Sequence, residues 1–227
     1  QNEMQGAKFA GHIVIEAGEE IEEDGTTPKG WNNAKSGTLL AGIKANYPTI
    51  ETPKTTPGSA ISLSTEALLA STPDDYGTSY YFRGAITNNY VQFANKCWRV
   101  VRITGNGAIK LVLHNDNISK VSNPCNASNN DENAAFARYS DTTYTSAFNS
   151  SYNQNAYVGF MYGTPGSSTY AAEHANTHDS IILTNLKKWY DLSFNTEQKN
   201  MLADVIWCND KSTYKNTSYN PLSITVG

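Results

Sequence analysis

The amino-acid sequence predicts an α+β fold made of antiparallel hairpins, two short helices and long irregular loops. The first reason is the stretch 97–116 (CWRVVRITGNGAIKLVLHND), in which two runs rich in β-branched residues flank an Asn-Gly turn. Such an arrangement is among the strongest local signals for a β-hairpin. The second reason is a pair of amphipathic stretches further along the chain, which a long polar region without periodicity separates from the hairpin.

Composition points to a secreted or surface protein. Only 17% of the 227 residues are charged, whereas about 25% is usual in soluble proteins. Asn, Ser, Thr, Gly and Tyr supply the polar share instead, which suits turns, extended strands and tyrosine-rich surfaces. The net charge is −4 and Lys and Arg form no cluster, so the sequence predicts no nucleic-acid binding.

The sequence predicts no transmembrane segment, because no apolar run approaches the roughly 18 residues of a membrane span. The chain begins at Gln1 without a signal peptide. We expect a mature or cut fragment that has lost its export signal or anchor. The expected location is extracellular, at the cell surface.

We divide the chain into three parts by composition and pattern. Residues 1–30 are an N-terminal strand and acidic tail, and residues 31–75 hold short helices and a Pro-rich linker. Residues 76–227 are expected to form the α+β domain.

The elements expected before residue 76 are short. A strand is expected over 12–17 and a helix over 36–48, which stops before Pro48. A second short helix is expected over 64–71 (STEALLAS), capped by its Ser or Thr. The acidic stretch 19–24 is interpreted as a solvated charge run, because the ligand spacing of a calcium loop is missing.

The strand-rich part begins at about Tyr76. A first hairpin with Asn88-Asn89 at its turn leads into the 97–116 hairpin, which predicts three consecutive antiparallel strands. Residues 117–170 are polar and irregular except for 156–163, which can form a strand. Alternation in the second hairpin places Ile109, Leu111 and Leu113 on one face and Lys110, Val112 and His114 on the other.

Two helices are expected after the polar region. The first covers 179–190 with Asp179 as N-cap, and the second covers 195–207 with a capping box formed by Asn195 and Gln198. We expect Trp98 and Trp189 to be buried, with Trp189 packing its helix onto the sheet. The apolar faces consist of Ile182, Leu186, Trp189 and Tyr190 in the first helix and of Met201, Leu202, Val205 and Ile206 in the second.

Three cysteines are present, Cys97, Cys125 and Cys208. Cys97 opens the hairpin and Cys125 lies in the loop that follows it, so a disulfide between them would tie the loop to the strand and contribute about 3 kcal/mol. The alternative is three reduced, buried cysteines, as in a cytosolic protein. We predict the Cys97–Cys125 disulfide, which leaves Cys208 without a partner inside this chain.

No constellation of residues predicts catalysis or a metal centre. His174 and His178 are four residues apart, which on a helix would place both imidazoles on one face, as in a zinc site. The polar residues around them favour a loop, no third ligand is evident, and the HExxH motif is absent. Neither a G-x-S-x-G motif nor a phosphate-binding loop occurs. We therefore predict no catalytic residue, no metal, no cofactor and no enzymatic activity.

Three sequence segments are distinctive: DDYGTSYYFRGAITNNYVQFANKCWRVVRITGNGAIKLVL, NAYVGFMYGTPGSSTYAAEHANTHDSIILTNLKKWY and WCNDKS. Together they resemble a family of large, poorly characterised surface proteins of Gram-positive gut bacteria, over about residues 36–227. These proteins are distantly similar to C-type-lectin-like domains, in which a Trp-Arg strand leads to a helix that ends in Trp-Tyr or Trp-Leu. Trp98-Arg99 and Trp189-Tyr190 correspond to these two marks.

The resemblance implies a lectin-like domain that is incomplete at its C-terminal end, because the family's second β-subdomain does not follow Cys208. A cysteine of that portion would pair with Cys208. We expect either that the polypeptide continues past Gly227 or that another copy or a partner covers the open edge. Calcium-dependent sugar binding is not expected, since only WCND at 207–210 comes near the calcium motifs of such lectins.

The sequence favours an extracellular, adhesin-like binding module of a bacterial surface that recognises a glycan or a protein. Aromatic side chains among Asn and Ser are typical of such binding faces, and they are frequent in 117–170. The alternatives are a structural subunit of a surface fibre or array and, third, a secreted hydrolase. The predicted ligand-binding residues are Tyr139, Tyr144, Tyr152, Tyr157 and Tyr162.

Overall fold

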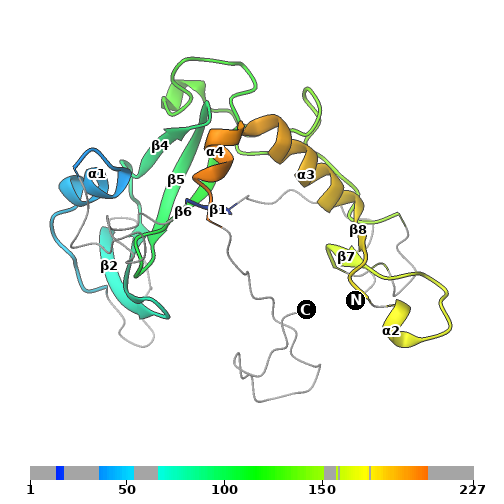
Figure 1. The fold of residues 1–227 in the computed structure, drawn as a ribbon. Coiled ribbons are helices and arrows are strands. Elements are labelled where there is room, and N and C mark those ends of the chain that lie inside the picture. The colour runs from blue at the N-terminus through cyan, green and yellow to red at the C-terminus, as the bar shows by residue number, and fades with distance from the viewer. Residues whose placement is uncertain are drawn as a thin grey trace.

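A computed structural model shows an α+β protein in which one antiparallel sheet carries a few short helices (Figure 1). The residues that the structure describes are 14–17, 36–53, 66–150, 157, 159–173 and 175–203. The strands are β1 (Val14–Ala17), β2 (Ala67–Asp74), β3 (Gly77–Gly84), β4 (Tyr90–Phe93), β5 (Lys96–Ile103), β6 (Ile109–Asn115), β7 (Met161–Tyr162) and β8 (His178–Asp179). The helices are α1 (Leu39–Asn46), α2 (Tyr170–Glu173), α3 (Ile181–Ser193) and α4 (Thr196–Asn200).

The main sheet has the strand order β1-β6-β5-β3-β2, and β4 pairs with β5 beside this path. β1 lies antiparallel to β6, with Val14 opposite Val112, so the strand expected in 12–17 is confirmed for residues 14–17. β7 and β8 form a separate two-stranded sheet. The antiparallel α+β class is therefore confirmed.

The hairpin predicted over 97–116 is formed by β5 and β6. Its turn closes with a 2.8 Å hydrogen bond from the Thr104 N–H to the Ala108 carbonyl, and Gly107 has a φ of +94°, which favours glycine. Trp98 faces Leu113 across the two strands. The predicted alternation is confirmed, because Ile109, Leu111 and Leu113 are buried while Lys110, Val112 and His114 are only partly covered.

The first predicted hairpin is wrong in its pairing. β3 pairs with β2 along its whole length, and β4 pairs with β5 through a turn at Ala94 and Asn95, both of which have positive φ. The Asn88-Asn89 dipeptide does not reverse the chain between paired strands. Asn89 is buried and its Nδ2 donates to the Val100 carbonyl at 2.7 Å, which fixes the segment that crosses from β3 to β4.

The helix predicted over 64–71 is also wrong, because residues 67–74 form the strand β2. The Ala-Leu-Leu-Ala run fits either element when taken alone, and the pairing with β3 decides for the strand. On the other side of β2 the Glu51 N–H donates to the Leu69 carbonyl at 2.9 Å. Pro73 is tolerated because the strand lies at the end of the sheet order.

The remaining helix predictions are confirmed with changed limits. α1 begins after the N-cap Thr38 and ends before Tyr47, as expected for a helix stopped by Pro48. The predicted N-cap Asp179 is wrong: Asp179 lies in β8, and the hydroxyl of Ser180 caps α3 by accepting from the Leu183 N–H at 3.1 Å.

The capping box of Asn195 and Gln198 is present at α4, but this helix ends at Asn200 instead of residue 207. Met201 is exposed and Leu202 packs against the core. The predicted apolar positions Val205 and Ile206 lie outside the described residues.

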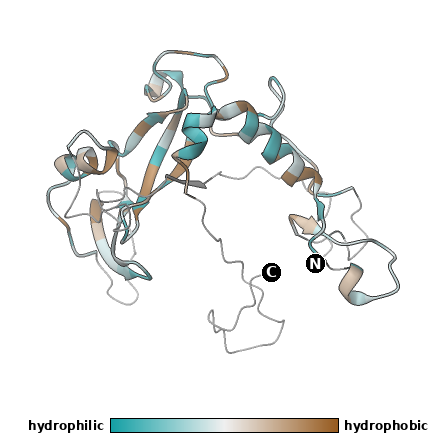
Figure 2. Ribbon diagram, in the orientation of Figure 1, coloured by the Kyte–Doolittle hydropathy of each residue, from teal (hydrophilic) through white to brown (hydrophobic). Residues whose placement is uncertain are grey.

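The core is one cluster that joins α1, the sheet and α3. Trp98 and Trp189 are 0% and 3% exposed, and their ring centroids are 6.3 Å apart, so the predicted burial and packing are confirmed. Phe194, just after α3, stacks on Trp98 at 6.1 Å. Figure 2 shows hydrophobic residues along the sheet strands and at the N-terminal end of α3.

The disulfide predicted between Cys97 and Cys125 is present, with a Cα–Cα distance of 4.9 Å. It fixes the loop after β6 to β5. Asn115 reinforces this connection, because its Nδ2 donates to the Pro124 carbonyl at 3.2 Å and to the Asn129 carbonyl at 3.0 Å. Cys208 lies outside the described residues. Within the part of the chain that the structure describes, no helix has the length and apolar character to cross a membrane.

Candidate functional site

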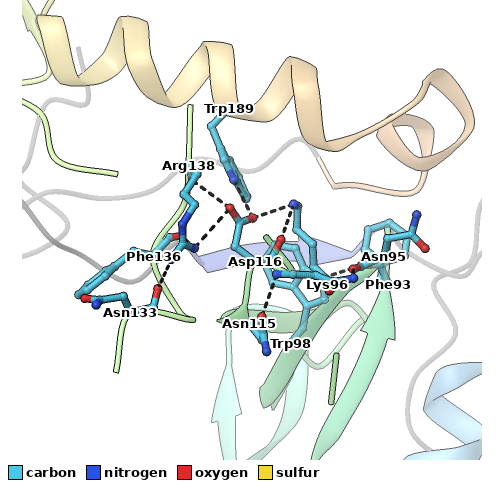
Figure 3. Close-up of polar contacts among 11 residues, drawn as sticks. Phe93, Asn95, Lys96, Trp98, Asn115, Asp116, Asn133, Phe136, Arg138 and Trp189 are labelled. Carbon is cyan, nitrogen blue, oxygen red and sulfur yellow. Dashed lines mark hydrogen bonds and ion pairs between the residues drawn. The ribbon is translucent and has the colours of Figure 1, made fainter. Parts of the chain in front are cut away.

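A buried carboxylate, Asp116, connects the sheet, the loop after it and α3 (Figure 3). Its Oδ1 lies 2.7 Å from the Lys96 Nζ and accepts a 3.1 Å hydrogen bond from the Trp189 Nε1. Its Oδ2 accepts from the Arg138 N–H at 2.9 Å, and the Arg138 Nη1 lies 4.0 Å away. Trp189 comes from α3, Lys96 from β5 and Arg138 from the loop after β6, so one side chain fixes three segments.

The polar groups around Asp116 are occupied by contacts within the chain. The Arg138 guanidinium donates to the Phe136 carbonyl at 2.9 Å and to the Asn133 carbonyl at 2.8 Å. The Lys96 Nζ also donates to the Asp116 carbonyl at 3.2 Å. These bonds stabilise the loop and hold α3 on the sheet, and we interpret the cluster as structural.

Two of the predicted ligand-binding tyrosines belong to this loop. The Tyr139 hydroxyl donates to the Thr145 carbonyl at 2.8 Å, and its ring packs against the core. The Tyr144 ring stacks on Phe136 at 4.9 Å, and its hydroxyl donates to the Asn133 Oδ1 at 3.1 Å. Both side chains thus take part in folding the loop.

Two other predicted tyrosines, Tyr157 and Tyr162, lie together in another part of the molecule, near the N-terminal end of α3, which follows β8 (Figure 1). The rings of Tyr157 and Tyr162 are 4.6 Å apart, and Tyr162 stacks on His178 at 5.6 Å. Phe148 and Phe160 form a neighbouring ring pair at 5.1 Å. We call these five residues the distal aromatic group. The fifth predicted tyrosine, Tyr152, lies outside the described residues.

Backbone pairing of β7 with β8 positions the distal aromatic group. Tyr162 lies opposite His178 in the ladder, and the Tyr162 carbonyl accepts from the Thr177 N–H at 3.1 Å. The Ser180 N–H, at the start of α3, donates to the Phe160 carbonyl at 2.8 Å. The same residue that caps α3 therefore fixes the chain that carries the rings.

An asparagine completes the support. The Asn149 Nδ2 donates to the Tyr157 carbonyl at 2.8 Å. Tyr157 and Tyr162 are half-buried, His178 is exposed and Phe160 is 42% exposed. The group thus offers aromatic surface to solvent from a backbone that hydrogen bonds hold in place.

Sequence reasoning missed three members of this group, Phe148, Phe160 and His178. Phe160 and Tyr162 are two positions apart in a short extended run, which could have indicated a shared face. Phe148 and His178 are distant along the chain, and no sequence signal links them to Tyr162.

Of the two histidines considered as a zinc site, His174 lies outside the described residues. His178 stacks on Tyr162, and its Nδ1 lies 3.0 Å from the Thr177 Oγ1. Among the described residues there is no group of three or more His, Cys, Asp or Glu side chains that could hold a metal ion.

Comparison of the chain with protein-family models, with curated proteins and with solved structures found no match.

Proposed function

We propose that the chain is an extracellular binding module of a bacterial surface, adhesin-like, and that its ligand is a glycan bound at the distal aromatic group. The observation that carries this proposal is the contact of three rings, in which Tyr162 and His178 come from the β7–β8 sheet and Tyr157 packs against Tyr162 from the segment before β7. The Cys97–Cys125 disulfide is compatible with an oxidising, extracellular location.

The chemistry of the group suits a sugar. The C–H face of a pyranose ring is apolar and stacks on an aromatic ring, while its hydroxyls need donors and acceptors at the edge of the ring. Tyr157 and Tyr162 supply aromatic faces that are tilted by 48° to each other. His178 and Thr177 supply polar atoms beside them. Tyrosine combines apolar area and a hydrogen-bonding hydroxyl at low conformational cost, which favours its use at such sites.

The support of the group also favours a binding role. Aromatic residues that only fill a core are buried, whereas here Phe160 and His178 are exposed while hydrogen bonds hold their backbone. Binding costs less when the contact residues are already ordered, because less conformational entropy is lost.

The finer, lectin-like assignment of the fold belongs to the same proposal. Two sequence features shared with C-type-lectin-like domains support it: Trp98-Arg99 lies in the strand β5, and α3 carries Trp189-Tyr190 near its end. The rings of Trp98 and Trp189 pack together in the core.

A glycan array tests the proposed function. The purified chain is expected to bind a restricted set of glycans, and the Tyr162→Ala variant is expected to lose this binding. Tyr76→Ala is the matched control, because Tyr76 is 65% exposed in the β2–β3 turn, outside the distal aromatic group. Circular dichroism verifies that both variants fold. A chain that binds no glycan, or a Tyr162→Ala variant that binds like the wild type, would contradict the proposal.

A further inference from the structure

A cavity of about 260 Å³ lies where β3 separates from β5, between the β5–β6 hairpin and the segment 84–89. It is built from other elements than the distal aromatic group. Its apolar lining includes Ile86, Val101 and Val112, and its polar side chains are Asn89, Arg99 and His114. No Asp or Glu lines it, although the chain as a whole is acidic with a net charge of −4.

Hydrogen bonds fix the Arg99 side chain at this cavity through its Nε and Nη2. Its Nε donates to the Asn89 Oδ1 at 3.3 Å and its Nη2 to the Ile86 carbonyl at 3.2 Å. The guanidinium lies 5.7 Å from the centre of the Tyr90 ring. Asn89 is itself buried and held by Val100. The Nη1 donates to none of the described residues, so a preoriented charged donor is available to a ligand.

The hydrogen bonds around His114 indicate which ring nitrogen carries its proton. The Asn115 Oδ1 accepts from the Asn117 N–H at 2.8 Å, so the Asn115 Nδ2 is the group that donates to the Asn130 Oδ1 at 2.9 Å. With this assignment of the Asn130 amide, its Nδ2 donates to the His114 Nε2, which lies 2.9 Å away. The neutral imidazole therefore carries its proton on Nδ1, which has no partner among the described residues.

His114 is a neutral donor at neutral pH. Burial, and to a smaller extent the positive charge of Arg99, lower the pKa of His114 below its ordinary value. Its ring also lies 4.6 Å from the Tyr90 ring. The cavity thus combines one fixed cationic donor, one neutral N–H donor and an apolar wall.

We propose that this cavity binds a small organic carboxylate, with the Arg99 Nη1 and the His114 Nδ1–H as donors to its oxygens. A carboxylate matches the donors, because a guanidinium favours planar anionic oxygens. The apolar lining selects a ligand with an apolar body. The volume lies below the roughly 300–1,000 Å³ of pockets for drug-sized molecules, so the ligand is smaller than these. This site is independent of the proposed glycan-binding function.

The test is an NMR titration of the isotopically labelled chain with sodium benzoate, read at the Arg99 side-chain Nε–H and at the His114 ring. We expect saturable shifts at both groups. Benzamide has the same shape without the charge, and we expect it to bind at least about tenfold more weakly than benzoate. We expect the same of inorganic phosphate, which has no apolar body to contact the lining. No saturable shift, or equal binding of benzamide or phosphate, would overturn the proposal.

Two variants separate the site from the fold. Arg99→Gln is expected to weaken benzoate binding at least about tenfold, whereas the control Arg102→Gln is not, because the Arg102 guanidinium bonds to the Ser79 Oγ at 2.6 Å. Val101→Phe leaves both donors in place and fills the cavity, and it is expected to abolish binding even if Arg99→Gln does not fold. Unchanged benzoate affinity in a folded Val101→Phe protein would overturn the proposal.

Discussion

Asp116→Asn is the substitution that tests most sharply how α3 and the loop after β6 are held on the sheet. The carboxylate offers two acceptor oxygens, one to Lys96 and Trp189 and the other to the Arg138 N–H. An amide of the same shape offers one oxygen and one NH₂ group. Whichever way the amide turns, its NH₂ faces a donor and a buried hydrogen bond is lost. The Lys96 ammonium also loses its buried counter-charge.

The expected loss of stability follows from two costs. Removing one partner of a buried ion pair destabilises a protein by about 3–5 kcal/mol, and an unmet buried hydrogen bond costs about 1–3 kcal/mol. Asparagine retains part of the hydrogen bonding, so we expect a loss of about 3 kcal/mol. For a chain of this size that lowers the melting temperature by about 6–12 °C.

Urea unfolding followed by tryptophan fluorescence and circular dichroism measures this loss, since Trp189 contacts Asp116 directly. Asp191→Asn is the control: its carboxylate lies 2.7 Å from the Lys199 Nζ, but its side chain is 69% exposed. Such surface pairs contribute at most about 1 kcal/mol. If Asp116→Asn is no less stable than Asp191→Asn, the Asp116 cluster does not hold α3 and the loop on the sheet.

Three further predictions concern stability. Cys125→Ser, which opens the disulfide to Cys97, should cost about 3 kcal/mol in urea unfolding, and an unchanged midpoint would show that the loop holds without it. Ser180→Ala should cost about 1 kcal/mol as a lost N-cap, and Asp179→Ala should cost less, because its carboxylate takes part in a partly exposed ion pair with Lys187; the reverse order would restore Asp179 as the cap. His114 has a lowered pKa in the folded state, so as pH falls below 6.5 the unfolded chain takes up its proton first and stability decreases. In His114→Gln this part of the decrease should be absent, and an identical pH profile in both proteins would contradict it.

The parts of the fold that could be predicted from the sequence are those fixed by residues close together in the chain. The 97–116 hairpin depends on its own turn and alternation. The capping box needs only Asn195 and Gln198, and the disulfide joins the two ends of one hairpin-and-loop unit. The burial of Trp98 and Trp189 follows from their positions on apolar faces.

The errors arose where pairing with another segment decides. Residues 67–70 fit a helix locally, and only β3, which follows in the chain, makes them a strand. Asp179 and Ser180 are both good N-caps, and the pairing of Asp179 with Met161 in the β7–β8 ladder leaves Ser180 as the cap.

The candidate site could be predicted only in part for the same reason. Tyr157 and Tyr162 are near in sequence and both belong to the predicted ligand-binding set, and the structure places them in contact. His178 joins them through the β7–β8 pairing, which no local pattern indicates. Tyr139 and Tyr144 share the same composition signal but are used within their own loop. The frequency of tyrosine therefore locates aromatic segments, but it does not distinguish tyrosines that face solvent from tyrosines that stabilise a loop.

Glycan binding at the distal aromatic group can be measured by calorimetric titration of the chain with the glycan that gives the strongest array signal. We expect saturable binding that Tyr162→Ala weakens at least about tenfold and Tyr76→Ala leaves unchanged. Equal dissociation constants for the wild type and Tyr162→Ala, or no measurable heat with any glycan, would contradict it.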